Sequence, residues 1–271
     1  MSRNFKMAVS SADNAPKTAP LLLLGDITEN LVTASKIGYD AIEIHMRENA
    51  SIDYNEIMET CKEHKVGISA IVSGRLAVQE DVHITDAEPD KLEKAMNGMY
   101  QYIDIASSLQ TDIIIGWIRG KAVEPKTKKE FDTIFAKNLK ILSEAAKKKN
   151  VKLHIEAINR YEINTCNTAE ETLGLINDYH LDNVYVHLDT FHMNIEEVDI
   201  AKAILLCKDK LGYIHFADSN RLYPGAGHLN FNEIMDALEK IKYKGYISVE
   251  CLPFPTGREA AEKAIQYVKS L

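Results

Sequence analysis

Cysteine is scarce in this sequence, and its few copies lie far apart. The 271 residues contain four cysteines, Cys61, Cys166, Cys207 and Cys251, and no two of them form a Cys-x-x-Cys pair. This spacing argues against a disulfide framework and against a zinc site built from cysteines. A reducing compartment is the simplest setting for such a chain, so we expect a cytoplasmic protein.

Long apolar runs are missing as well. The leucine run Leu21–Leu24 spans four residues, whereas a helix that crosses a bilayer needs roughly 20 apolar residues. The segment Met1–Val9 contains no apolar core of the length found in signal peptides. We therefore expect neither a membrane-spanning helix nor a secretory leader, and no membrane partner.

The chain also lacks an excess of basic residues. It carries 32 Lys and Arg against 40 Asp and Glu, which gives a formal net charge of −8. A protein that holds long nucleic acid by its phosphates needs basic side chains to release counterions. We therefore do not expect nucleic acid as a partner. The apolar share of 45% and the charged share of 27% are typical of a globular protein.

What the sequence does contain is one repeated pattern. A short β-rich run is followed by a longer segment of helical periodicity, and this happens about eight times. Most of the short runs are continuously apolar, as expected for strands that are covered on both faces. The predicted strands are 5–9, 41–45, 67–72, 112–117, 152–156, 184–188, 212–216 and 246–251. The predicted helices are 53–65, 89–109, 128–150, 168–179, 231–241 and 257–271.

Alternating strands and helices predict an α/β protein with a parallel sheet. Eight units over this length fit a (β/α)8 TIM barrel. A doubly wound open sheet is the structural alternative, but the glycine-rich turn that usually follows its first strand is missing. No linker or break in composition interrupts the chain, so we expect a single domain over residues 1–271. The longest irregular stretch, 10–26, is expected to form a loop over the barrel mouth.

Ligand-type side chains end four consecutive predicted strands. Glu156, Asp189, His215 and Glu250 are separated by 33, 26 and 35 residues, about one strand–helix unit each. The active site of a TIM barrel lies where the carboxyl ends of its strands meet. We therefore expect these four side chains to arrive together at the mouth of the barrel.

Three carboxylates and one imidazole, without a thiolate, suit a hard or borderline divalent cation. Without a cation, such a cluster would repel itself and be costly to desolvate. We therefore expect one divalent metal ion as cofactor. Mn²⁺ is the leading choice, and Mg²⁺, Co²⁺ and Zn²⁺ are alternatives.

Motifs in the second half of the chain carry a family resemblance. They are EAINRYE (156–162), LDTFHMNIEE (188–197), SNRLYPGAGHLNF (219–231) and the strand-final Glu250. These motifs resemble the ketose 3-epimerases of the D-tagatose/D-psicose 3-epimerase group, within the xylose-isomerase-like barrel superfamily. The close resemblance covers about residues 152–250, and GYDAIEIH (38–45) agrees in pattern.

The resemblance implies a metal-dependent isomerase that epimerises C3 of a ketose through a cis-enediolate. It implies the metal ligands Glu156, Asp189, His215 and Glu250. It implies that Glu156 and Glu250 also form the acid–base pair. It implies substrate contacts from Glu162, His192, Arg221 and an aromatic wall at Trp117. The implied partner is a small sugar, and a homo-oligomer (dimer or tetramer) is common in the family.

Several other functions use a similar site. Hydroxypyruvate isomerase, inosose isomerase or dehydratase, and sugar-phosphate isomerase stay open as alternatives. An abasic-site endonuclease is a more distant alternative, because its Asp-Arg-His run after the seventh strand is replaced here by ADSNR (217–221). A barrel that binds sugar without catalysis is disfavoured, because both Glu156 and Glu250 are retained.

Other polar residues near the strand ends have roles that the sequence leaves open. His154 and His187 precede Glu156 and Asp189 by two residues, so they point the same way one layer deeper, and they are predicted either to pack there or to contact the ligand residues from below. Glu43 and His45 end the second predicted strand, and there a hydrogen-bonding role and a structural role are equally compatible with the sequence. The same holds for Asp218.

Overall fold

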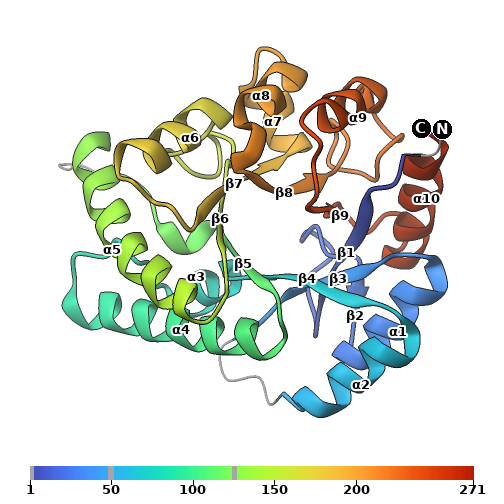
Figure 1. Cartoon of the computed structure of the whole chain (residues 1–271), viewed down its shortest axis with the longest axis horizontal. Helices are drawn as coiled ribbons and strands as arrows, with labels where there is room; N and C mark the ends of the chain where they lie inside the picture. Colours follow the sequence, from blue (N-terminus) through green and yellow to red (C-terminus); the bar gives the residue numbers. More distant parts are fainter. Residues whose placement is uncertain (1–2, 48–51, 124–126) are drawn as a thin grey trace.

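The strands of this protein close into a parallel barrel. The computed structural model describes residues 3–47, 52–123 and 127–271. Within them, one sheet runs in the order β2-β1-β3-β4-β5-β6-β7-β8-β9, and β1 (Lys6–Ala12) also pairs with β9 (Tyr246–Val249). This last pairing closes the barrel, with β2 (Leu23–Leu24) as a short edge segment on β1. Figure 1 shows the strands at the centre and the helices around them.

The other strands agree with the sequence pattern in number and order. They are β3 (Ala41–His45), β4 (Gly67–Val72), β5 (Asp112–Ile115), β6 (Leu153–Glu156), β7 (Val184–Asp189) and β8 (Leu211–Phe216). The predicted loop over residues 10–26 is partly wrong, because β1 continues to Ala12 and β2 lies inside the stretch. Parallel pairing of Ser11 with both Leu23 and Ile44 explains the longer strand.

Helices follow the strands around the outside of the barrel. Predicted helices correspond to α2 (Tyr54–His64), α4 (Pro89–Ser108), α5 (Lys128–Lys148), α6 (Ala169–Asp178), α9 (Phe231–Lys240) and α10 (Gly257–Ser270). The structure adds α1 (Ile27–Ile37), α3 (Gly74–Glu80), α7 (Thr190–Glu196) and α8 (Ile200–Cys207). Two short 3-10 helices are η1 (Trp117–Arg119) and η2 (Lys208–Lys210). Of these, α3, α7 and α8 span only seven or eight residues, so each offers few turns in which a helical period can be recognised, whereas α1 has 11 residues.

Local sequence signals explain where several helices begin. The Thr127 side chain and the Glu130 carboxylate form a complete capping box at the start of α5. At α6 the Thr168 hydroxyl accepts from the Glu171 backbone N–H, but the Glu171 carboxylate accepts from the backbone N–H of Asn167. The sequence TAEE (168–171) favours a capping box at this helix, and in the structure only its Thr168 half is formed.

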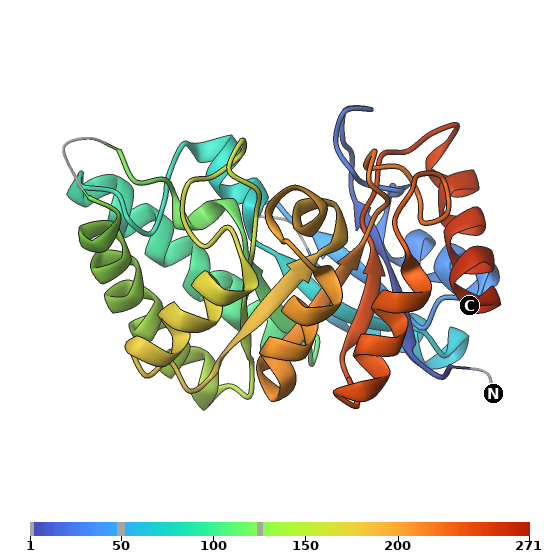
Figure 2. The same cartoon turned by 90° about the horizontal axis from the view of Figure 1, so that it is seen from above.

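Two strands end earlier than predicted, and both differences lie at the barrel mouth. The strand predicted over 112–117 ends at Ile115, because the chain turns at Gly116 and enters η1. The last strand ends at Val249, one residue before Glu250. Figure 2 shows the barrel from the side, with the carboxyl ends of the strands and the loops that follow them at the top. Among the described helices, none combines the length and apolar character that a membrane span requires.

Candidate active site

The four side chains predicted from the strand ends meet at one point. Glu156 ends β6, Asp189 ends β7, His215 lies one residue before the end of β8, and Glu250 follows β9. One ligand atom from each of the four lies within 4.8 Å of the others, and all four residues are buried. Neighbouring parallel strands place them there, since Asp189 pairs in register with His215.

The centre of this cluster contains polar atoms without partners. His215 Nδ1 lies 3.8 Å from Glu156 Oε1, 3.7 Å from Asp189 Oδ2 and 3.6 Å from Glu250 Oε2. Within the described residues, neither His215 Nδ1 nor Asp189 Oδ2 has a hydrogen-bond partner, although both atoms are buried. Buried polar atoms are normally satisfied. Three carboxylates and an imidazole nitrogen facing one another therefore fit a divalent cation.

The carboxylates of the cluster have strongly perturbed acidities. Burial raises the pKa of Glu156 well above its usual value, and the nearby Glu250 raises it further. Burial also raises the pKa of Glu250, although His215 opposes this. Burial would raise the pKa of Asp189 too, but His192 and His215 hold it below its usual value. Concentrated, poorly solvated negative charge of this kind favours the binding of a cation.

Asp189 has a second task at the start of α7. Its Oδ1 accepts hydrogen bonds from the backbone N–H groups of Phe191 at 2.7 Å and His192 at 3.4 Å. Aspartate is among the preferred residues at this capping position. One oxygen of Asp189 therefore anchors the helix, which leaves Oδ2 facing His215.

Arg221 and Glu162 lie beside the cluster as a pair. Arg221 Nη1 donates to Glu162 Oε1 at 2.9 Å, and Arg221 Nη2 lies 3.9 Å from Glu250 Oε2. The guanidinium carbon lies 4.8 Å from the centre of the Phe191 ring. With its side chain only 21% exposed, Arg221 is a site-facing residue and not a solvated arginine.

His192 also reaches the cluster, and a residue not singled out from the sequence orients it. His192 Nε2 lies 3.8 Å from Glu156 Oε1. The Asn159 side-chain amide donates to His192 Nδ1 at 2.7 Å and to Glu162 Oε1 at 3.2 Å. Because Nδ1 accepts, neutral His192 carries its proton on Nε2, toward Glu156. The only sequence signal for Asn159 was its place inside the motif EAINRYE.

The segment after β5 shapes the space behind Glu156. Trp117 starts η1 and is 44% exposed. At the preceding Gly116, a Cβ atom would lie 2.9 Å from Glu156 Oε2, so glycine permits this close approach. Arg119, also not singled out from the sequence, is fully buried and donates to the backbone oxygens of Glu156 at 2.8 Å and Thr165 at 3.0 Å.

Two of the roles left open by the sequence are structural. The buried Asp218 carboxylate accepts from the backbone N–H groups of Ser219, Gly225 and Leu229, at 2.8, 2.8 and 3.1 Å. Asp218 therefore orders the loop that carries Arg221. The ring of His187 lies edge-on beneath His215, with the ring centres 4.1 Å apart, which agrees with the predicted packing position.

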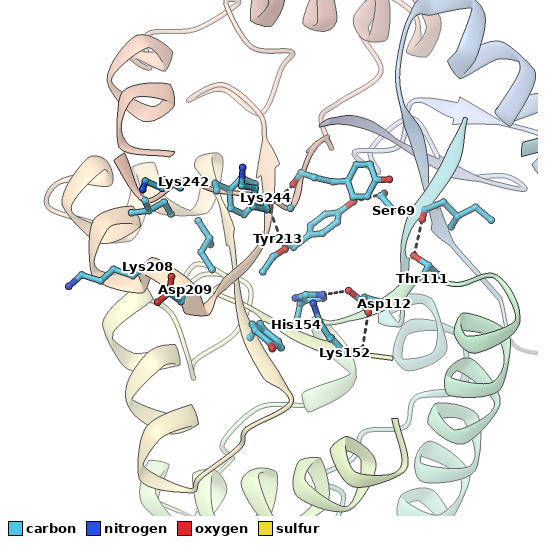
Figure 3. Close-up of a pocket in the computed structure, with 18 of the residues that line it drawn as sticks. Ser69, Thr111, Asp112, Lys152, His154, Lys208, Asp209, Tyr213, Lys242 and Lys244 are labelled. Atoms are coloured by element: carbon cyan, nitrogen blue, oxygen red, sulfur yellow. Dashed lines mark hydrogen bonds and ion pairs between the residues drawn. The ribbon is translucent and has the colours of Figure 1, made fainter. Parts of the chain in front are cut away.

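A cavity lies at the opposite end of the barrel. It has a volume of about 460 Å³ and is lined by residues at the amino-terminal ends of the strands. Figure 3 shows that several of its polar groups pair with one another. His154 Nε2 lies 3.2 Å from Asp112 Oδ2, and the Ser69 and Tyr213 hydroxyls lie 2.7 Å apart. The candidate active site is therefore assigned to the carboxyl end, where the unpartnered ligand atoms converge.

Similarity to known proteins shows the family to which this chain belongs. Residues 31–271 match the family described as xylose isomerase-like TIM barrel, and the chain belongs to this family. An L-ribulose 3-epimerase from Methylomonas sp. (strain DH-1) is 31% identical over 220 residues, which cover 80% of this chain and 75% of that protein. A D-psicose 3-epimerase from Enterocloster bolteae is 43% identical over 114 residues, which cover 42% of this chain and 38% of that protein.

A solved structure agrees with this relationship. The structure of an L-ribulose 3-epimerase superposes with a TM-score of 0.84 at 26% identity, covering 98% of this chain and 93% of that one. The chain is thus a homologue of ketose 3-epimerases, which are sugar-acting enzymes of the isomerase class. The family resemblance and the TIM-barrel fold expected from the sequence are both confirmed.

Proposed function

We propose that this protein is a metal-dependent epimerase that inverts C3 of a small ketose. The observation that carries the proposal is the convergence of Glu156, Asp189, His215 and Glu250, with ligand atoms within 4.8 Å of one another. Homology to enzymes named L-ribulose 3-epimerase and D-psicose 3-epimerase supports the choice of reaction.

The proposed metal ligands are the four residues of this cluster, with Mn²⁺ as the preferred ion. The unpartnered Asp189 Oδ2 and His215 Nδ1 support this assignment, because both aim at the space between the side chains. When bound, a divalent cation supplies the positive charge that lowers the free energy of an enediolate.

Glu156 and Glu250 are the proposed acid–base pair. They come from β6 and from the end of β9, so they approach the cluster from different sides. Burial raises the pKa of each, which makes a carboxylate a stronger base. One glutamate removes the C3 proton, and the other returns a proton to the opposite face of the planar intermediate. Two bases on two faces invert the carbon.

Binding and orientation of the sugar are assigned to the residues around this pair. Glu162, His192 and Arg221 supply acceptors and donors for hydroxyl and carbonyl oxygens. Their mutual contacts through Asn159 and the Arg221–Glu162 pair support a preorganised arrangement. Trp117, with its exposed ring, is the proposed apolar wall.

Isotope exchange tests the reaction. The Mn²⁺-loaded protein is incubated in D₂O with D-psicose, L-ribulose and their phosphorylated counterparts, and the products are followed by NMR. We expect deuterium at C3 of an epimerised free ketose. An aldose product labelled at C2 would instead indicate aldose–ketose isomerisation, and turnover of the phosphorylated sugars alone would exclude a free ketose as substrate.

Substitution of the proposed bases completes this test. Glu250→Gln and Glu156→Gln should each lower kcat by roughly 10²–10⁴-fold, the range that general acid–base catalysis contributes. Glu59, an exposed residue of α2, provides the matched control, since Glu59→Gln should leave kcat unchanged. Full activity in either site variant would contradict the assignment.

A further inference from the structure

We infer that Glu43 is a positioning residue of this site, holding His215 directly and Glu250 through His45. The inference rests on the proposed function, because it concerns the same metal cluster. Glu43 lies on β3, outside the strands that supply the four proposed ligands, and its partner His215 is 172 residues away in sequence.

Both oxygens of Glu43 are engaged by histidines. Its side chain is 0% exposed. Glu43 Oε2 lies 2.7 Å from His215 Nε2, and Glu43 Oε1 lies 2.9 Å from His45 Nε2. Each carboxylate oxygen acts as an acceptor toward the imidazole nitrogen that it faces, so both histidine nitrogens act as donors.

This arrangement determines which nitrogen of His215 faces the cluster. With its proton on Nε2, neutral imidazole has its lone pair on Nδ1. His215 Nδ1 is the atom that lies 3.7 Å from Asp189 Oδ2 and 3.6 Å from Glu250 Oε2. A carboxylate behind a metal-binding histidine sets its tautomer and ring orientation in this way.

The second oxygen of Glu43 reaches Glu250 through His45. His45 Nε2 lies 2.9 Å from Glu43 Oε1 and 3.5 Å from Glu250 Oε1, so one N–H group faces both carboxylates. The other oxygen of Glu250, Oε2, faces His215 Nδ1 at 3.6 Å. Glu43 is therefore connected to one proposed metal ligand directly and to one proposed base through a single histidine.

The barrel offers a matched pair for comparison. Asp112 and His154 form a carboxylate–histidine contact of 3.2 Å at the amino-terminal end, among the cavity residues of Figure 3. It has the same chemistry but no contact with the metal cluster. A substitution of Asp112 therefore reports the general effect of losing such a pair from the barrel.

The test is the Mn²⁺ affinity of Glu43→Gln, measured by calorimetry, together with the side-chain ¹⁵N shifts of His215 in histidine-labelled protein. Glutamine keeps the size of Glu43 but cannot accept from both histidines in the same way. We expect one ion per wild-type chain and a Kd about 10–100-fold weaker in Glu43→Gln, the usual effect of removing such a partner. We also expect the ¹⁵N shift of His215 Nε2 to change in the metal-free protein, because this nitrogen loses its carboxylate partner. Asp112→Asn should change neither quantity.

Other results would overturn the inference in distinguishable ways. Wild-type affinity in Glu43→Gln, or weaker affinity with an unchanged His215 Nε2 shift, removes the positioning role and leaves the proposed function intact. Two ions per chain would make Glu43, His45 and Glu250 a second ligand set. Failure of the wild-type protein to bind any ion would instead overturn the proposed function. If Glu43→Gln does not fold, the same comparison is made with Glu43→Asp, which keeps the charge at a shorter reach.

Discussion

A single side-chain amide determines how His192 is presented to the candidate active site. Asn159 Nδ2 is a donor, so its contact with His192 Nδ1 requires that nitrogen to be an acceptor. The same amide contacts Glu162 Oε1, which in turn accepts from Arg221. The proposed substrate-binding residues are thus joined into one network by a residue that need not touch the sugar.

Removal of this amide should weaken both substrate binding and stability. In Asn159→Ala, the buried His192 Nδ1 loses its donor, which lowers the free energy of unfolding by about 1–3 kcal/mol. We expect a higher KM as well, because His192 is free to reorient. Urea unfolding and steady-state kinetics measure the two effects.

A second asparagine provides the control for this prediction. The exposed Asn164 side chain accepts a hydrogen bond from the Ala122 backbone N–H at 3.0 Å and donates one to the Ala122 backbone oxygen at 2.8 Å. Asn164→Ala should therefore leave KM unchanged. Equal effects of the two substitutions on KM would show that the Asn159 amide has no specific role.

At the scale of elements, the loop between β8 and α9 is held by one buried carboxylate. Asp218 accepts three backbone hydrogen bonds from within this loop. The backbone oxygen of Arg221 also accepts from the Leu252 N–H at 2.8 Å, which ties the loop to the segment that follows Glu250. The loop therefore has a defined path although it contains no helix or strand.

Substitution of Asp218 should disturb substrate binding without changing metal binding. In Asp218→Asn, one acceptor oxygen becomes a donor that faces backbone N–H groups, and we expect unfolding to become easier by about 1–3 kcal/mol. KM should rise because Arg221 is displaced, whereas the Mn²⁺ affinity should be unchanged. Asn220→Ala, which removes an exposed contact with the Ala226 oxygen, is the control. An altered metal affinity in Asp218→Asn would contradict this division of roles.

At the scale of the whole molecule, the proposed metal site joins four consecutive strands of the barrel. Its ligands come from β6, β7, β8 and the end of β9. Unfolding separates these ligands, so an ion that binds only the folded chain stabilises it by mass action. Without the ion the buried carboxylates repel one another, which further lowers the stability of the metal-free protein relative to the metal-bound protein.

Mn²⁺ should therefore raise the melting temperature. At a free concentration 100 times Kd, the stabilisation is about 2.7 kcal/mol, or roughly 5–10 °C for a chain of this size. Asp189→Asn is a sharp comparison, because asparagine preserves the helix cap while removing the charge. Scanning calorimetry with and without Mn²⁺ should show the shift only in the wild-type protein. A shift of equal size in Asp189→Asn would place the ion elsewhere.

Much of this architecture was predictable because it depends on local patterns. Short β-rich runs marked β3 and β4 to the residue. The short helices α3 and α7 were not delineated, since one or two turns carry little periodicity. Trp117 was expected to end a strand, but the turn at Gly116 places it in a 3-10 helix.

The alternation of strand and helix was enough to specify the barrel and to place Glu156, Asp189, His215 and Glu250 at its mouth, because every parallel strand of a barrel ends at the same rim. The partners of Glu43, Asn159 and Asp218 became known from the folded chain alone. Their hydrogen bonds depend on the directions of side chains and loops. The Glu43–His215 contact, for example, joins residues 172 apart in the sequence on β3 and β8, two strands that do not pair with each other. No local pattern in the sequence can predict a contact between residues so far apart along the chain.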